Sequence, residues 1–269
     1  LEALDIECKK DLTGVGENLQ DHLDSMVTVR SNKPESIGIS WRTLLNRVIP
    51  APFQYYFKKM GWWTTNYVEA GGFAQTQSIS GDLPDVQFHF TPTFRSHRGR
   101  KFEFGHGYSL FTCLLQPCSV GSIKLARDND DLKLLIDHNF LSDPRDEIAM
   151  VEALKKAREV LASSEFDAVR GMEMAPGKDV QSDAQILQYL RNTATTVFHP
   201  VGTCKMGVDE LAVVSPKDLK VRGMNNLRVI DASIMPRIIR GNTAAATMMI
   251  GEMGARMILV DQQPKQEET

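Results

Sequence analysis

The chain has 269 residues, of which 42% are hydrophobic and 24% charged, and these values exclude a disordered or fibrous class. Its 31 basic and 34 acidic residues give a formal charge of -3, so no basic surplus indicates nucleic acid or an anionic membrane as partner. Four cysteines without a C-x-x-C spacing predict free thiols in a reduced, cytoplasmic compartment, and no histidine has a zinc-like spacing that would predict a metal site.

The first part of the chain is expected to enter a sheet. Residues 1–24 are interpreted as a connecting segment, because Gly, Asn and Asp cluster there between apolar anchors. Apolar and polar residues alternate over 25–30, which predicts a half-buried strand. Apolar residues recur at helical spacing over 40–60, but Pro50 and Pro52 interrupt them. We therefore expect two short helices in that span.

Five further runs of strand-forming residues are separated by turn residues such as Gly81, Pro84 and Gly121. They lie at residues 68–75, 85–91, 108–115, 122–126 and 133–136. The simplest arrangement of these runs is a mostly antiparallel sheet.

Two helices are expected after these strands. The first covers residues 142–164 and has four apolar residues on one face, Ile148, Val151, Leu154 and Val160. The second covers 182–192, where Ser182 and Asp183 can cap the free N–H groups. Beyond them the sequence predicts one strand over 227–230 and a final helix over 242–260, which Glu252 and Arg256 exclude as a membrane span.

His199 is a candidate proton acceptor. Pro200 restricts its backbone to extended conformations, and its neighbours Thr195, Thr196 and Gly202 supply little charge. A buried imidazole in such surroundings stays neutral and can accept a proton near neutral pH. A lone histidine with a purely structural role is the alternative.

The start of the final helix is a second candidate site. Asp231 is expected at the end of the strand 227–230, and Asn242 and Thr243 at the helix start. Free N–H groups there can stabilise an anionic ring or a phosphate. A plain Asn-capped helix explains the same residues equally well. Gly14 and Gly16 favour a glycine turn over a phosphate-binding loop.

Five motifs together carry a family resemblance. They are GVGENLQDH at residues 14–22, EAGGF at 69–73, TATTVFHPVGTCKMG at 193–207, LRVIDASIMP at 227–236 and GNTAAATMMIGE at 241–252. With these motifs in this order, nearly the whole chain resembles the glucose–methanol–choline (GMC) oxidoreductase family, most closely its choline dehydrogenase and related alcohol dehydrogenase branch.

The resemblance implies an α+β fold in which a mostly antiparallel sheet with flanking helices forms a substrate-binding domain over residues 25–192. Residues 1–24 and 193–269 would complete an FAD-binding domain, the latter as a catalytic segment. The family's Rossmann-type strand and glycine-rich loop do not occur in this sequence. The resemblance therefore implies an FAD enzyme of which this chain is the C-terminal half, without the dinucleotide site.

The resemblance also implies residue roles. His199 matches the histidine that takes the hydroxyl proton of an alcohol while hydride passes to the flavin. The residues that would approach the cofactor are Asn18, Asp231, Ala232, Asn242, Thr243 and Ala244, with Asp21 and His22 in the same loop as Asn18. Ala244 stands where the family usually has a second Asn or His. Either Asn242 assists catalysis, another residue does, or the enzyme is slow.

The substrate is expected to be a small primary alcohol. The resemblance places Glu69 where choline-oxidising relatives have a carboxylate against the trimethylammonium group, and Trp62, Trp63 and Tyr67 offer aromatic faces for a cation. Gln116 is placed on the substrate side by position only. The alternatives are that Glu69 is a structural acid at a strand edge and that Trp62 and Trp63 cap a helix end. A non-catalytic binding module and an oxygen-using alcohol or choline oxidase also stay open, as do the electron acceptor, a homodimer and peripheral association with the inner face of a membrane.

Overall fold

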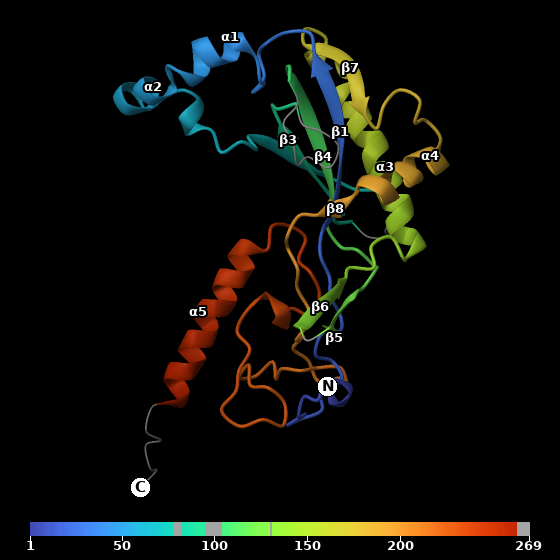
Figure 1. Ribbon diagram of the computed structural model, residues 1–269, viewed down its shortest axis with the longest axis vertical. Helices are drawn as coiled ribbons and strands as arrows, with labels where there is room; N and C mark the ends of the chain where they lie inside the picture. The colour runs from blue at the N-terminus through green and yellow to red at the C-terminus, as the bar shows by residue number, and fades with distance from the viewer. Residues whose placement is uncertain (78–81, 95–103, 130, 263–269) are drawn as a thin grey trace. The chain divides into compact units, whose positions relative to one another are not determined.

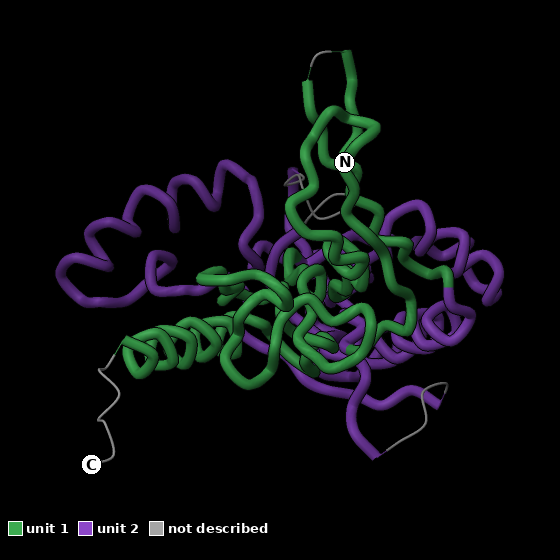
Figure 2. The backbone as a smooth tube through the Cα atoms, turned by 90° about the horizontal axis from the view of Figure 1, so that it is seen from below, with its two compact units in different colours: residues 1–22, 116–142, 198–269 green, residues 23–115, 143–197 purple. Residues whose placement is uncertain are grey.

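The structure is a computed structural model that describes residues 1–77, 82–94, 104–129 and 131–262. The chain divides into two compact units, which Figure 2 colours green and purple. Unit 1 is made of residues 1–22, 116–142 and 198–269, and unit 2 of residues 23–115 and 143–197. Helices and antiparallel strands together confirm the predicted α+β class.

Unit 2 is built on an antiparallel sheet with the strand order β2-β3-β4-β1-β7, and β8 pairs with β1 (Figure 1). Its strands are β1 (Leu23–Ser31), β2 (Ala70–Ala74), β3 (Val86–Thr91), β4 (Gly107–Leu114), β7 (Arg170–Ala175) and β8 (Thr195–Thr196). The antiparallel sheet was predicted from the sequence, whereas β7 and β8 were not.

β1 lies in the middle of this sheet, between β4 and β7. The strand predicted over 25–30 is therefore present, but seven of the nine residues of β1 are buried, so the half-burial expected from its alternating sequence is wrong. Thr28 is one of its buried polar residues, and its hydroxyl lies 3.0 Å from that of Ser109. The Met26 carbonyl accepts a hydrogen bond from the Tyr189 hydroxyl at 2.9 Å. Buried polar groups that are paired in this way do not destabilise the core.

The two helices predicted over 142–164 and 182–192 are present. In α3 (Pro144–Leu161) the Asp143 side chain accepts from the Arg145 N–H, and α4 (Asp183–Thr193) begins with a capping box of Ser182 and Gln185. α3 packs on β1 and β4, but Ile148 and Val160 are exposed. The buried face is instead made of Ala149, Met150, Val151, Ala153, Leu154, Ala157 and Leu161. Its small alanines let the helix approach the sheet closely.

The span predicted to hold two short helices contains a series of short helical elements. They are α1 (Trp41–Thr43), the π-helical η2 (Leu44–Val48), α2 (Ala51–Lys58) and the 3₁₀ turn η3 (Trp62–Thr64). Pro50 is the N-cap residue of α2 and Pro52 lies in its first turn, where a missing N–H costs nothing. The prolines therefore begin a helix as well as end one.

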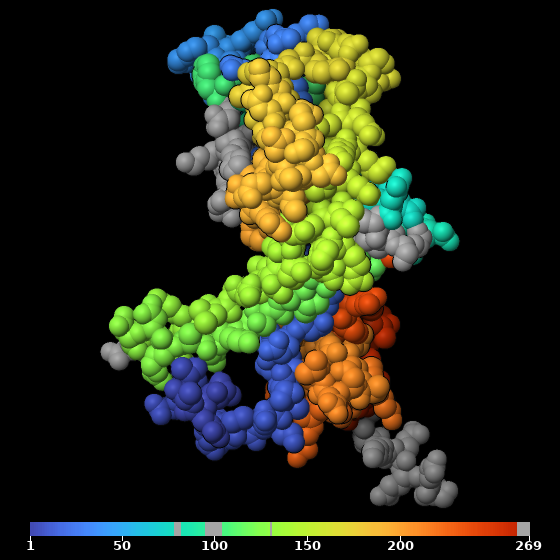
Figure 3. Space-filling view, turned by 90° about the vertical axis from the view of Figure 1, so that its right-hand side faces the viewer, coloured from blue at the N-terminus to red at the C-terminus, as the bar shows by residue number. Residues whose placement is uncertain are grey.

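β5 (Ser122–Asp128) and β6 (Asp131–Asp137) form a separate two-stranded sheet in unit 1 and not part of the larger one. The Ile123 N–H donates to the Gly16 carbonyl at 2.7 Å, and Arg127 donates to the Leu4 carbonyl. Figure 3 shows this green hairpin beside the dark blue N-terminal residues. These contacts assign residues 116–142 to unit 1, whereas the sequence predicted one continuous domain over 25–192.

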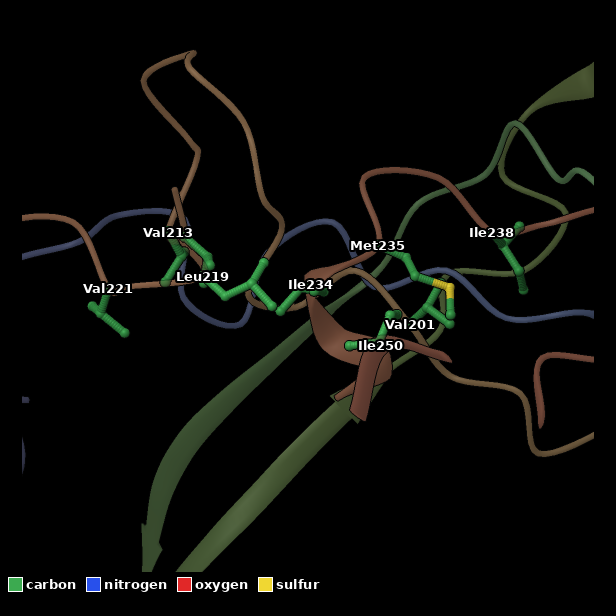
Figure 4. Packing of buried hydrophobic residues seen from close by; sticks show 9 residues of the cluster. Val201, Val213, Leu219, Val221, Ile234, Met235, Ile238 and Ile250 are labelled. Carbon is green, nitrogen blue, oxygen red and sulfur yellow. The ribbon is translucent and has the colours of Figure 1, made fainter. Parts of the chain in front are cut away.

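The core of unit 1 consists mainly of residues from loops (Figure 4). Its buried members are Val201, Val213, Val214, Leu219, Val221, Ile234, Met235, Ile238 and Ile250. The strand predicted over 227–230 is wrong, because this segment makes only an isolated bridge between Lys220 and Arg228. Val229 and Ile230 pack against the core instead.

The last two helical elements of unit 1 are η6 (Ala232–Ile234) and α5 (Ala244–Asp261). α5 begins two residues later than predicted, and its N-cap residue is Thr243 instead of Asn242. Among the residues that the structure describes, no helix is long and apolar enough to cross a membrane.

Two glycines of α5 provide a matched test of its packing. A Cβ added at Gly254 would lie 2.2 Å from Cγ2 of Ile230, whereas one added at Gly251 would meet nothing within 4 Å. We expect Gly254→Ala to destabilise the chain by about 1–3 kcal/mol through overpacking. Gly251→Ala should stabilise it by up to about 1 kcal/mol, because alanine favours the helix. Urea unfolding of both variants checks this, and equal effects would contradict the packing of α5 on Ile230.

Candidate active site

Two distant segments of unit 1 pair with each other around His199. Gln20 and Val201 exchange two backbone hydrogen bonds of 2.9 and 3.0 Å, and the His199 N–H donates to the Asp21 carboxylate at 2.9 Å. Gly202 has a φ of 95°, and a Cβ there would lie 2.3 Å from the Asn18 carbonyl. Only glycine permits both this backbone conformation and this close approach. The turn after His199 is thereby held against residues 18–22.

His22 is the side-chain partner of His199. The two Nδ1 atoms are 3.0 Å apart, and the rings meet edge to face. The Nε2 atom of His22 lies 3.0 Å from the Ile239 carbonyl oxygen. His22 is fully buried, so its two ring nitrogens depend on protein partners for hydrogen bonds.

These contacts determine which nitrogen carries each proton. A carbonyl oxygen only accepts hydrogen bonds, so His22 must donate from Nε2 to Ile239. A neutral His22 that donates from Nε2 has a lone pair on Nδ1, which is then an acceptor. The bond between the two histidines therefore requires His199 to donate from Nδ1. In neutral His199 the remaining nitrogen, Nε2, carries a lone pair and can accept a proton.

Burial lowers the pKa of His199 below 6.5, while the negative charge of Asp21 raises it by a smaller amount. The neutral imidazole expected from the sequence is thus the form present near neutral pH. The sequence did not predict Asp21 as a charged neighbour of His199. Asp21 is almost completely buried, and its Oδ2 lies 3.8 Å from the Nδ1 atom of His138.

Asn18, predicted to bind the cofactor, holds two loops together in this structure. Its Nδ2 atom lies 3.2 Å from the carbonyl oxygens of Gly202 and Pro236. Gln20 donates to the Asn18 side-chain oxygen at 3.0 Å and to Pro236 at 3.1 Å. Asn18 therefore connects the loop of His199 with the one that follows Asp231.

Asp231 and Ala232 lie at a loop in unit 1. The exposed Asp231 side chain accepts from the Ser233 N–H at 2.8 Å and so caps η6. The Ser233 carbonyl in turn accepts from the Cys204 N–H at 2.9 Å. The loop is thus fixed next to the segment after His199. Asp231 was predicted to end a strand, but it does not.

The first turn of α5 contains no acidic residue, and Thr243 makes no side-chain capping hydrogen bond. Asn242 and Ala244 are exposed at this end, while Thr243 is buried. The first N–H groups of an α-helix have no intrahelical acceptor. The start of α5 therefore presents backbone donors and the positive end of the helix dipole.

The three residues predicted to bind substrate are divided between the units. Gln116 lies in unit 1 and donates to the Ile238 carbonyl at 3.4 Å, one residue before the carbonyl that binds His22. Glu69 and Trp62 belong to unit 2. Glu69 is exposed and accepts from the Thr65 hydroxyl, and the Arg47 guanidinium carbon lies 5.6 Å from the centre of the Trp62 ring.

The structure thus brings His199, Asn18 and the Asp231 loop together, with Gln116 connected through Ile238. It adds the direct contact with His22 and the Ile239 carbonyl, which the sequence did not predict. His22 ends the GVGENLQDH motif, and this was its only sequence signal. In the described part of the chain no group of three or more His, Cys, Asp or Glu residues could hold a metal ion.

The class of protein follows from comparison with known families. The family model of the GMC oxidoreductases matches residues 117–251, about half of the chain. The chain therefore belongs to the GMC oxidoreductase family. This confirms the resemblance carried by the five motifs.

Within this family two relatives are similar over nearly the whole chain. Alcohol dehydrogenase [acceptor] of Pseudomonas putida is 43% identical over 249 residues, covering 93% of this chain and 45% of the relative. Oxygen-dependent choline dehydrogenase of Acinetobacter baumannii is 38% identical over 258 residues, covering 96% of this chain and 46% of the relative. The chain thus spans about half the length of the curated relatives that it matches.

Solved structures agree with this fold. Pyridoxine 4-oxidase from Mesorbium loti is similar with a TM-score of 0.78 and 26% identity, over 98% of this chain and 47% of that one. Formate oxidase from Aspergillus oryzae has a TM-score of 0.84 and 23% identity, over 97% and 50%. The second likeness concerns the fold alone.

The charge balance at His199 can be tested by replacing Asp21. Asp21→Asn removes the negative charge that favours the imidazolium, so we expect the pKa of His199 to fall further and protonation to require a lower pH. An NMR titration of the His199 ring protons measures this. Asp209→Asn, a change at an exposed residue of the same unit, is the control and should leave the titration unchanged. A higher pKa of His199 in Asp21→Asn would contradict the balance described.

Proposed function

We propose that this chain is the C-terminal part of an FAD-dependent alcohol dehydrogenase, similar to choline dehydrogenase, that oxidises a primary alcohol with His199 as the proton acceptor. The observation that carries this proposal is the hydrogen bond of the two histidines, which leaves the lone pair of His199 on Nε2, where it can accept a proton. The names of the relatives, an alcohol dehydrogenase and a choline dehydrogenase, support the reaction class.

The residues of unit 1 fit a flavin. The start of α5 offers open backbone donors with no acidic residue nearby in its first turn, which suits the electron-rich pyrimidine end of the ring. We assign Asn242, Thr243 and Ala244 to this end, and Asp231 and Ala232 to the ribityl chain and pyrophosphate. The dinucleotide site would lie in the part of the relatives that the chain does not span. FAD, when bound, would supply the hydride acceptor.

The protein's own groups manage the proton. His199 Nε2 takes the proton of the alcohol hydroxyl, and the bond from His199 Nδ1 to His22 prevents the ring from rotating. Burial keeps His199 neutral before the reaction. The nearby Asp21 carboxylate stabilises the imidazolium that the transfer produces. The same environment thus favours the base beforehand and stabilises its conjugate acid afterwards.

Asn242 is proposed as the second hydrogen-bonding group at the alcohol oxygen. Ala244, at the usual position of an Asn or His, has no polar side-chain atom, whereas Asn242 is exposed at the same end of α5. Loss of one such donor typically costs about 10²-fold in rate. A module that binds but does not oxidise is the second candidate, and Ala244 is the observation that favours it.

An uncharged primary alcohol is the better supported substrate. The Trp62 ring already faces the Arg47 guanidinium, which would repel a trimethylammonium group, and Glu69 is hydrogen-bonded by Thr65. We propose that Gln116, whose amide lies in the same unit as His199, contacts the substrate.

The four free cysteines support a reduced, cytoplasmic location. The proposal also includes an electron acceptor that takes the electrons from the flavin, a homodimer, and peripheral association of the protein with a membrane.

The role of His199 is tested in the full-length protein. His199→Gln should lower kcat by about 10²–10⁴-fold with an artificial electron acceptor, because glutamine cannot take the proton. Flavin content and circular dichroism should be unchanged, and Asp209→Asn should retain full activity. Undiminished turnover in His199→Gln would reject this residue as the base. Binding of alcohol without any flavin reduction in the unmodified protein would favour the binding module.

A further inference from the structure

The charge of the chain is unevenly distributed. Between Glu35 and Glu69 the sequence contains no acidic residue, although the chain has 34. The same stretch contains four basic residues, Arg42, Arg47, Lys58 and Lys59, and so has a formal charge of +4. The total of -3 therefore conceals a basic segment, and the absence of a basic surplus holds only for the chain as a whole.

This basic stretch also contains an unusual number of aromatic residues. All three tryptophans of the chain, Trp41, Trp62 and Trp63, lie within it. Four more aromatic residues lie between them: Phe53, Tyr55, Tyr56 and Phe57. We call residues 41–63, which comprise α1, η2, α2 and the start of η3, the aromatic arm.

The aromatic side chains of the arm are not part of a core. Within this fully described segment only Thr43 and Ala51 are buried, and Trp41, Tyr56 and Phe57 are 76%, 72% and 74% exposed. In Figure 1 the two helices extend away from the sheet of unit 2, and Figure 2 shows their turns projecting from the same unit. Exposed apolar surface of this extent marks an interaction site.

Aromatic and basic groups of the arm lie close together. Lys59 Nζ is 5.1 Å from the centre of the Tyr55 ring and 5.8 Å from that of Tyr56, and Arg47 lies over Trp62. Tryptophan and tyrosine rings prefer the headgroup level of a bilayer, and adjacent Lys and Arg side chains bind its anionic phosphates. The eight residues of α2 are too few to cross a membrane. Their chemistry fits a helix lying in the interface.

We propose that the aromatic arm docks the protein on the surface of an anionic lipid bilayer. Its aromatic and aliphatic side chains enter the interface, and its four basic residues contact lipid phosphates. This inference specifies the peripheral membrane association included in the proposed function. It does not depend on the alcohol chemistry, because no residue of the oxidation site in unit 1 takes part.

The three tryptophans allow lipid binding by the arm to be followed by fluorescence. Since all three lie in the arm, the tryptophan emission of the 269-residue chain arises from this segment alone. Mixing the chain with vesicles of phosphatidylcholine and phosphatidylglycerol should shift that emission to the blue and carry the chain into the vesicle pellet. Vesicles of phosphatidylcholine alone should bind it far more weakly, and salt should weaken binding to the anionic ones.

Variants separate the two contributions. Phe53→Ser with Phe57→Ser, one turn apart on α2, should weaken binding to anionic vesicles about tenfold. Arg42→Gln with Lys58→Gln should weaken it about 25-fold at low salt, since each basic residue contributes about a factor of five. Matched controls outside the arm, Ile148→Ser with Val160→Ser and Lys178→Gln with Lys217→Gln, remove exposed apolar and basic residues and should leave binding unchanged.

Three results would overturn the proposal. They are no binding to anionic vesicles, equal binding to both vesicle types, and equal losses in arm and control variants. Analytical ultracentrifugation without lipid identifies a second copy as the occupant: a dimer that Phe53→Ser with Phe57→Ser dissociates, together with emission that vesicles do not change, would assign the arm to self-association. A failure of any kind leaves the role of His199 untouched, because that role is measured by turnover.

Discussion

The hydrogen bond between His22 and His199 is the interaction on which the site depends. It joins residues 177 positions apart in the sequence, and the Ile239 carbonyl gives it a direction by binding the opposite nitrogen of His22. Three segments of unit 1 thereby determine the orientation of one imidazole. Without His199, the buried Nδ1 atom of His22 would lose this hydrogen bond, and leaving a buried polar group unsatisfied costs about 1–3 kcal/mol. Geometry and stability therefore favour the same arrangement.

The electrostatic surroundings of His199 act in two opposite directions. Burial disfavours its charged form, and the Asp21 carboxylate favours it by a smaller amount. A base needs both, because it must be neutral to accept a proton and must tolerate the charge once the proton has arrived. Asp21 also accepts the His199 backbone N–H. One carboxylate therefore orients the residue and adjusts its charge.

Local patterns in the sequence predicted much of the fold, and long-range contacts were the part they missed. The antiparallel sheet and the helices α3 and α4 follow from alternation, periodicity and capping residues, which neighbouring residues determine. The strand expected over 227–230 failed because strand formation needs a paired neighbour, and this segment has only one bridge. The β5–β6 hairpin was predicted to be part of the larger sheet, but it is not, because its contacts are with the N-terminal residues.

The candidate site shows the same division. The family motifs indicated His199 and the loops around Asn18 and Asp231, but no spacing rule relates His22 to a histidine so far along the chain. Composition likewise hid the basic aromatic arm, because acidic residues elsewhere cancel its charge. Both features appear only when distant residues are placed in space or when charge is followed along the chain.

The most direct test of the account is the position of the ring protons. Long-range ¹H–¹⁵N NMR spectra of the histidine side chains at neutral pH distinguish the two neutral forms of imidazole. We predict that His199 carries its proton on Nδ1 and His22 on Nε2, as their contacts require. A His199 ring protonated on Nε2 would contradict the account, because that nitrogen could not then accept the proton of an alcohol.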